Sequence, residues 1–92
     1  MPKSLYTTQF RRDVKRIQKA GSKDLEKLKT VVRMLVDGKP LESKYVDHPT
    51  GGNLKGHRDC HIEADWILPY RIDKDRQEIV FVRTGSHSEL FG

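Results

Sequence analysis

The spacing of apolar residues changes halfway along this chain, and that change limits the possible folds more than any other feature. In the first part, apolar side chains recur every three or four positions, as along one face of a helix: Phe10, Val14 and Ile17, followed by Leu25, Leu28, Val32 and Leu35. After residue 56, the apolar residues fall in short runs separated by turn-forming residues, a pattern typical of strands. The sequence therefore predicts two helices followed by a sheet.

The ends of both helices are marked by residues that favour such positions. Gly21 is expected to end the first helix, and Ser22 is a candidate N-cap for the second. Gly38 and Pro40 are expected to end the second helix, because glycine suits the end of a helix and proline cannot continue it. The short connection predicts that the two helices are antiparallel neighbours.

Four segments are predicted to form strands. The first is residues 3–8, and the others are His57–Glu63, Trp66–Ile72 and Glu78–Thr84. Because proline cannot donate to a strand ladder, Pro69 predicts an edge position or a bulge in the third of these. The order predicts one α+β domain covering residues 1–92, with a short N-terminal strand, two antiparallel helices and a C-terminal antiparallel sheet. The helices would cover one face of the sheet and leave the other free for a site.

The composition excludes several classes of protein. No apolar run approaches the roughly 18 residues that a membrane-spanning helix needs, and the first residues contain no apolar signal-peptide core. Cys60 is the single cysteine, so no disulfide can form within the 92 residues. These features lead us to expect a cytoplasmic protein that does not associate with membranes.

Positive charge is concentrated in the first half of the chain. Residues 1–50 contain twelve Lys or Arg and six Asp or Glu, a net charge of +6, whereas residues 51–92 have a net charge of −1. In the first helix, Arg11, Arg12 and Lys15 are candidates for contact with a polyanion such as RNA. A solvated helix face or a surface for an acidic protein partner would have the same composition.

The histidines do not have the spacing of a metal site. His57 and His61 are four residues apart, which along a strand separates them by about 13 Å, and Cys60 alternates to the opposite face. The chain contains neither a CxxC nor an HExxH motif. We therefore expect no metal ion and no other cofactor.

A site for acid–base chemistry fits the ionisable residues better. Internal cleavage of RNA needs a base for the 2′-OH, an acid for the leaving 5′-oxygen and a cation for the phosphate. Histidine suits the first two roles, and arginine suits the third. The candidates lie in loops or at strand ends: His48, His61, Asp65, Arg83 and His87.

The candidates come from separate parts of the predicted fold. His48 lies in the long loop of residues 39–56, and long loops in small domains are often functional. Arg83 is expected at a sheet edge, where its loss should leave no cavity. Each candidate could instead be an ordinary turn or surface residue, and Trp66, which alternates with Leu68, could simply belong to the core.

Three motifs together resemble the YafQ group of bacterial toxins, within the wider RelE/ParE-like superfamily. They are DHP at residues 47–49, RDCHIEADW at residues 58–66 and RTGSHSELFG at residues 83–92. The resemblance covers nearly the whole chain and implies a small sheet backed by two helices. It also implies a ribosome-dependent mRNA endonuclease, silenced by a DinJ-like antitoxin with a ribbon-helix-helix part. Operon DNA would be bound only by the complex of the two.

The resemblance also carries roles onto the matching residues. It implies that His87 is the general acid and that Arg83 binds the scissile phosphate. His48 or His61, helped by Asp65, would accept the proton of the 2′-OH.

Two aromatic residues complete the site that the resemblance implies. Trp66 and Phe91 would shape a pocket for a base. Leu90 and Phe91 could alternatively anchor the C-terminal tail by burial, which for a large apolar side chain contributes roughly 1.5–3 kcal/mol.

Two other functions stay open at this point. ParE-like relatives share the scaffold, lack this set of histidines and act on gyrase, so a toxin of that kind would leave mRNA intact. A nucleic-acid-binding or operon-binding module would keep its cellular effect after His87 is replaced.

Overall fold

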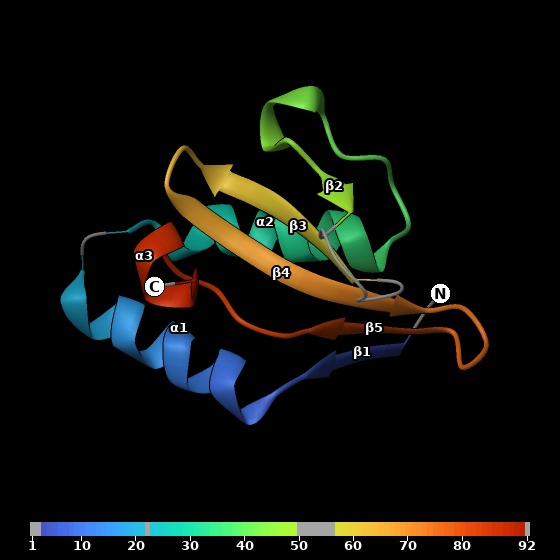
Figure 1. Ribbon diagram of the computed structural model, residues 1–92, viewed down its shortest axis with the longest axis horizontal. Coiled ribbons are helices and arrows are strands. Elements are labelled where there is room, and N and C mark those ends of the chain that lie inside the picture. Colours follow the sequence, from blue (N-terminus) through green and yellow to red (C-terminus); the bar gives the residue numbers. More distant parts are fainter. Residues whose placement is uncertain (1–2, 22, 50–56, 92) are drawn as a thin grey trace.

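The chain folds as a strand, two helices and a predominantly antiparallel sheet (Figure 1). The computed structural model describes residues 3–21, 23–49 and 57–91. The helices are α1 (Thr8–Ala20), α2 (Leu25–Val36), the 3-10 helix η1 (Ser43–Tyr45) and the short C-terminal α3 (His87–Phe91). The strands are β1 (Lys3–Tyr6), β2 (His48–Pro49), β3 (His57–Glu63), β4 (Trp66–Asp73) and β5 (Glu78–Phe81). The predicted α+β fold class is confirmed.

The strands within the described residues form one sheet in the order β1-β5-β4-β3-β2. Strands β3, β4 and β5 pair antiparallel, as predicted, and β2, which was not predicted, pairs antiparallel with β3. Strand β1 lies parallel to β5, with Leu5 opposite Val80, so the sheet is mixed rather than wholly antiparallel. The parallel pair joins the two ends of the chain, because β1 opens the fold and β5 is its last strand.

The two main helices begin and end at residues suited to those positions. Thr7 caps α1 by accepting a hydrogen bond from the N–H of Phe10 at 2.9 Å. Gly21 ends α1 with a φ of 66°, a conformation that glycine adopts without strain. The cap of α2 is Asp24, whose side chain accepts from the first turn of the helix. Ser22, the predicted cap, lies outside the described residues.

The core lies between the helices and one face of the sheet, and α2 runs behind the sheet in Figure 1. It contains these buried side chains: Phe10, Ile17, Leu28, Val31, Cys60, Ile62, Trp66, Leu68, Tyr70, Ile79 and Phe81. Successive residues of a strand point to opposite faces, so burial of Cys60 and Ile62 places His61 on the other face of β3. The alternation of β3 thus determines which face carries a histidine.

The prediction that Pro69 lies at a sheet edge is wrong, whereas the alternative of a bulge is confirmed. Pro69 lies in β4, which pairs with β3 on one side and with β5 on the other. The regular β4–β5 ladder ends at the pair of Tyr70 and Phe81, next to Pro69. Pairing resumes beyond Pro69 between Ile67 and Gly85, with one extra residue on the Gly85 side. Val82 donates its N–H to the Pro69 carbonyl at 3.1 Å, but proline has no N–H with which to return the bond. The Val82 carbonyl instead accepts from the hydroxyl of Thr7 at 2.7 Å. That bond replaces the missing one, and β5 ends at Phe81 rather than at the predicted residue 84.

The segment of residues 39–56 was predicted as a loop without regular structure, and its described part contains both η1 and β2. Strand β2 pairs antiparallel with β3 and places His48 opposite Asp59. Residues 50–56 lie outside the described residues. His48 is therefore held at the edge of the sheet by strand pairing rather than carried on an irregular loop.

Candidate active site

His48 and His61 lie near one another on the adjacent strands β2 and β3. Their ring centroids are 6.1 Å apart, because His48 pairs with Asp59, two residues before His61 on the same face. Nδ1 of His48 lies 3.1 Å from the Pro49 carbonyl oxygen, and Nδ1 of His61 lies 3.4 Å from that of Ala64. A carbonyl only accepts, so these bonds place the proton on Nδ1 and leave Nε2 of a neutral ring as an acceptor. Either ring can therefore act as a base through Nε2.

Asp47 fixes the start of β2 to the sheet. Its carboxylate accepts from the Tyr70 hydroxyl at 2.6 Å and from Nε of Arg58 at 3.2 Å. Burial of Tyr70 and its bond to Asp47 raise the pKa of the hydroxyl, which therefore stays protonated as the donor. The anchor lies one residue before His48 and limits the movement of its backbone. Asp47 was not predicted as a functional residue, although it is the first residue of the DHP motif.

A bulge and a tight turn separate β3 from β4 and position Asp65. The β3–β4 ladder shifts register between His61 and Glu63, beside the histidine ring. In the turn that follows, Oδ1 of Asp65 accepts from the backbone N–H of His87 at 3.0 Å. The resemblance implied that Asp65 assists proton transfer by a histidine side chain, whereas here its carboxylate holds the first residue of α3. Asp65 thus ties the C-terminal tail to the β3–β4 turn.

The tail folds as the short helix α3, and a capping box starts it. The Ser86 hydroxyl accepts from the N–H of Glu89 at 3.2 Å, and the Glu89 carboxylate accepts from the N–H of Ser86 at 2.8 Å. These bonds to Ser86 lower the pKa of Glu89. Glu89 also pairs with Nε of Arg16 at 3.1 Å, which joins α3 to α1 (Figure 1). This helix was not predicted, although the S-x-x-E pattern of residues 86–89 is a signal for it.

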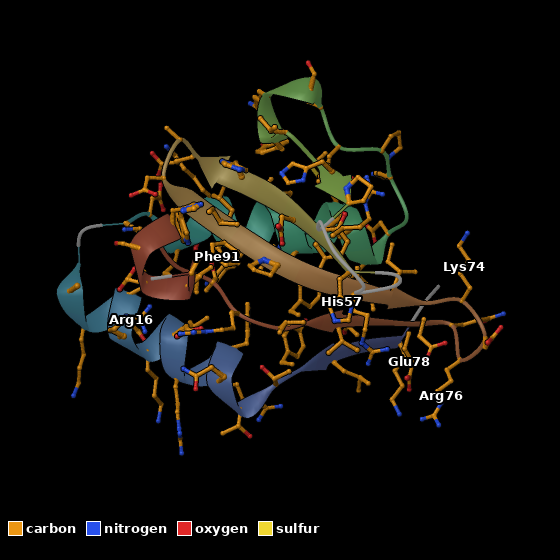
Figure 2. The ribbon with its side chains drawn as sticks, in the orientation of Figure 1. Arg16, His57, Lys74, Arg76, Glu78 and Phe91 are labelled. Carbon is orange, nitrogen blue, oxygen red and sulfur yellow. The ribbon has the colours of Figure 1, made fainter. Side chains whose placement is uncertain are left out.

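Phe91 packs against His87 rather than into the core (Figure 2). The two ring centroids are 5.0 Å apart, a contact that the i,i+4 spacing along α3 provides. Phe91 is 55% exposed, which contradicts the alternative that its burial anchors the tail. One part of the ring limits the orientation of the imidazole, and the rest is open to solvent.

Arg83 is paired with a buried carboxylate that was not predicted as part of the site. Its Nε and Nη2 donate to the two oxygens of Asp13, each at 3.1 Å, and Asp13 is wholly buried. Arg16 and the backbone N–H of Thr84 also donate to this carboxylate. Burial raises the pKa of Asp13, but the hydrogen bonds outweigh it, and the pKa lies below its ordinary value. The available signal was an acid on the apolar stripe of α1, three residues after Phe10.

This pairing corrects the expectation that the loss of Arg83 leaves the interior undisturbed. Removing one partner of a buried ion pair leaves a buried charge, which costs roughly 3–5 kcal/mol. The remaining donors to Asp13 reduce that cost here. The Arg83 side chain is nevertheless 31% exposed, so its guanidinium can still reach a ligand.

Trp66 is a core residue with 1% of its surface exposed. Its Nε1 donates to the hydroxyl of Thr84 at 2.9 Å, and that hydroxyl donates to the carbonyl of Ile67 at 3.1 Å. The prediction that Trp66 lines a pocket for a base is therefore wrong. Trp66 instead holds Thr84, the neighbour of Arg83, from the interior.

The predicted polyanion contacts Arg11, Arg12 and Lys15 all lie on the exposed face of α1. The basic helix is joined to α3 through the pair formed by Arg16 and Glu89. Among the residues that the structure describes, no three His, Cys, Asp or Glu side chains are placed to share a metal ion. Within the same residues, no helix combines the length and apolar character needed to cross a membrane.

A family model described as the bacterial toxin YafQ of type II toxin–antitoxin systems matches residues 3–92. The chain belongs to the YafQ toxin family. The family's mRNA interferase toxin YafQ from Escherichia coli strain K12 is 44% identical over 88 residues, which cover 95% of this chain and 92% of that protein. The family expected from the three motifs is thus confirmed.

Two solved structures extend the comparison with YafQ-like toxins to the fold. A chain in the crystal structure of the E. coli DinJ–YafQ complex superposes with a TM-score of 0.93, is 42% identical and matches over the full length of both chains. A metal-bound toxin from Helicobacter pylori superposes with a TM-score of 0.91 and is 42% identical, over 99% of this chain and all of that one. Both likenesses confirm the arrangement of N-terminal strand, two helices and sheet.

Proposed function

We propose that this chain is an mRNA interferase, an endoribonuclease that cleaves mRNA in the ribosome and thereby inhibits translation. The observation that carries the proposal is the pair of rings of His48 and His61 at 6.1 Å, with His87 tied by Asp65 to the turn that follows β3. Membership of the YafQ family and 44% identity to the E. coli mRNA interferase toxin support the same activity.

The reaction is an internal transfer at phosphorus. A base removes the proton of the 2′-OH, the 2′-oxygen forms a bond to phosphorus, and the bond from phosphorus to the 5′-oxygen breaks. An acid gives its proton to that leaving oxygen. The products are a 2′,3′-cyclic phosphate and a free 5′-hydroxyl, and the reaction consumes no co-reactant.

Each step has a candidate group in this chain. Nε2 of His48 or of His61 accepts the proton of the 2′-OH, because Nδ1 of each ring is turned to a carbonyl. His87, the first residue of α3, protonates the leaving oxygen. Arg83 stabilises the charge that builds on the phosphate, using the part of its guanidinium that does not face Asp13.

Other exposed residues contact the RNA around the reacting phosphate. The open part of the Phe91 ring stacks on a base. Arg11, Arg12 and Lys15 on the outer face of α1 contact the phosphates of ribosomal or messenger RNA, or an acidic segment of the antitoxin. Charge of this kind positions an RNA-binding protein without specifying the sequence that it cleaves.

The partner of the chain is a DinJ-like antitoxin with a ribbon-helix-helix part, as the likeness to YafQ in the E. coli DinJ–YafQ complex suggests. The toxin reaches operon DNA only through that complex. Both proteins act in the cytoplasm, where translating ribosomes are found.

Mapping mRNA 5′ ends after brief expression tests the proposal. The wild-type chain is expected to create new 5′ ends within translated messages, and His87→Ala is expected to create none. Messages that stay intact with the wild-type chain would contradict nuclease activity and favour a toxin that acts on a protein. New 5′ ends produced equally by His87→Ala would contradict the role of His87 alone.

A further inference from the structure

Asp13 is a charged residue at a helix position that otherwise faces the core. It lies three residues after Phe10 and four before Ile17, on the buried side of α1, and none of its surface is exposed. Its oxygens accept from Gln9 Nε2 at 3.3 Å, Arg16 Nη1 at 2.8 Å, Arg83 Nε and Nη2 at 3.1 Å, and the Thr84 N–H at 3.2 Å. Three of these bonds come from a segment about 70 residues later in the chain.

Stability alone does not account for a carboxylate at this position. Taking an ion pair out of water is costly, and well-packed apolar side chains are often at least as stabilising. A carboxylate can, however, orient an arginine side chain, because two oxygens that accept from one edge of a guanidinium fix the plane of that group. Arg83 uses Nε and Nη2 for this contact, which leaves Nη1 and the outer end of its fork for another anion.

We infer that Asp13 is a positioning residue for the phosphate-binding group of the site. It orients Arg83 so that the outer end of the guanidinium faces the scissile phosphate. It also binds the N–H of Thr84, next to Arg83, and so fixes the segment that leads into His87. The inference rests on the proposed function and adds to it a residue that never touches the substrate.

Arg16 extends the same arrangement to α3 (Figure 2). Its Nη1 donates to Asp13 at 2.8 Å, and its Nε pairs at 3.1 Å with Glu89, which caps α3. The carboxylate of Asp13 therefore lies at the centre of contacts that run from Arg83 to the helix carrying His87. Through these contacts the cation and the acid of the site keep a fixed relation to each other.

The first test is Asp13→Asn, which keeps the size of the side chain and removes its charge and one acceptor. Single-turnover cleavage at saturating toxin on programmed ribosomes is expected to slow about 10²-fold, the loss that follows when a reacting group is misplaced by about 1 Å. The matched control, Asp24→Asn, removes an acid from the N-cap of α2, where asparagine caps equally well, and should not change the rate. A wild-type rate for folded Asp13→Asn would overturn the inference.

A double-mutant cycle with Arg83→Ala separates positioning from general stability. If Asp13 acts through Arg83, adding Asp13→Asn to Arg83→Ala lowers the cleavage rate little further. Ethylguanidinium, a small cation with the same fork, is expected to restore cleavage by Arg83→Ala and to fail with the double variant, because Asp13 is what holds it. Losses that multiply, or rescue of both variants alike, would assign Asp13 to general stability and overturn the inference.

Arg83→Lys supplies a test that does not require Asp13→Asn to fold. Lysine keeps a positive charge beside Asp13 but has no planar fork, so the ion pair remains and the orientation is lost. Cleavage is expected to fall as far as in Arg83→Ala, and wild-type cleavage by Arg83→Lys would overturn the inference. Wild-type cleavage by Arg83→Ala would contradict the proposed role of Arg83 itself. Slow cleavage by Arg83→Ala beside a wild-type rate for Asp13→Asn would contradict only the role of Asp13.

Discussion

Besides strand β3, which carries His61, two segments bring histidines to the candidate site, and they are held in different ways. The loop arm, residues 47–49, comprises Asp47 and the two-residue edge strand β2, and it is anchored through the bonds of Asp47 with Tyr70 and Arg58. The tail arm, residues 83–91, is held to the rest of the fold by Asp13, by the buried hydroxyl of Thr84, by the pair of Arg16 with Glu89, and by Asp65. Among the described contacts, the tail arm thus has more partners in the rest of the fold than the loop arm has.

The difference shows that a C-terminal position does not by itself predict mobility. Chain ends fray when nothing ties them, and here buried partners bind the segment just before α3. The tail arm carries the proposed acid and the proposed phosphate-binding cation on one segment, whereas the loop arm carries one candidate base on a short edge strand. Segments with few contacts open most easily, so we expect the loop arm rather than the tail arm to adjust when RNA enters.

Loss of the acid on the tail arm is expected to have the largest effect. His87→Ala should lower the cleavage rate by about 10²–10⁴-fold, the usual contribution of one general acid or base. The melting temperature should change little, because His87 is exposed and its backbone bond to Asp65 remains. His57→Ala, which removes a histidine outside both arms, is the matched control. Growth arrest by folded His87→Ala at the wild-type dose would show that the tail arm does not supply the acid.

Deletion of Phe91 and Gly92 should impair cleavage far more than antitoxin binding. If the ring of Phe91 aligns His87, its loss lets the imidazole drift, and a displacement of about 1 Å can cost 10²-fold in rate. If the ring also stacks on a base, its loss removes roughly 1–3 kcal/mol of substrate contact. Single-turnover kinetics separate a lower rate at saturation from weaker binding. Unchanged kinetics would mean that the tail arm needs no support from its last ring.

The main elements could be predicted because their signals are local. The recurrence of apolar residues every three or four positions predicted α1 and α2. Short apolar runs bounded by turn-forming residues predicted β3 and β4. The parallel pair of β1 and β5 could not be found this way, since it depends on packing between segments more than 70 residues apart, such as Leu5 and Val80. Helix α3 did have a local signal in Ser86 and Glu89, but its single short turn has no apolar period.

The site was harder to predict than the fold, because a motif does not distinguish a residue that touches substrate from one that supports it. Trp66 belongs to a matching motif, yet its alternation with Leu68 and Tyr70 is what determines its burial. Asp13 was counted as one charge on a basic helix, and its role depends on Arg83, which reaches it only in the folded chain.

Weakening the anchor of the loop arm should have a moderate effect. Tyr70→Phe removes the hydroxyl that donates to Asp47, while Arg58 remains as a donor, so the free energy of unfolding should fall by about 1 kcal/mol. Cleavage should slow less than after the tail deletion, because one of two candidate bases is displaced. Tyr6→Phe, at an exposed ring of β1, is the control for the loss of a hydroxyl. A rate loss as large as that of His87→Ala would show that both arms must be equally rigid.

The smallest expected effect is that of a metal chelator. The H. pylori toxin of similar fold is metal-bound. If the loop arm of this chain needed a metal ion, that ion would be coordinated by both His48 and His61. Proton transfer by two histidines with a guanidinium beside the phosphate needs no such ion. A chelator selective for transition metals, which leaves the magnesium of the ribosome in place, should therefore not change the cleavage rate on programmed ribosomes. A loss of cleavage that zinc or copper restores would show that the loop arm works as a metal ligand, and the acid–base mechanism would then have to be replaced by a metal-assisted one.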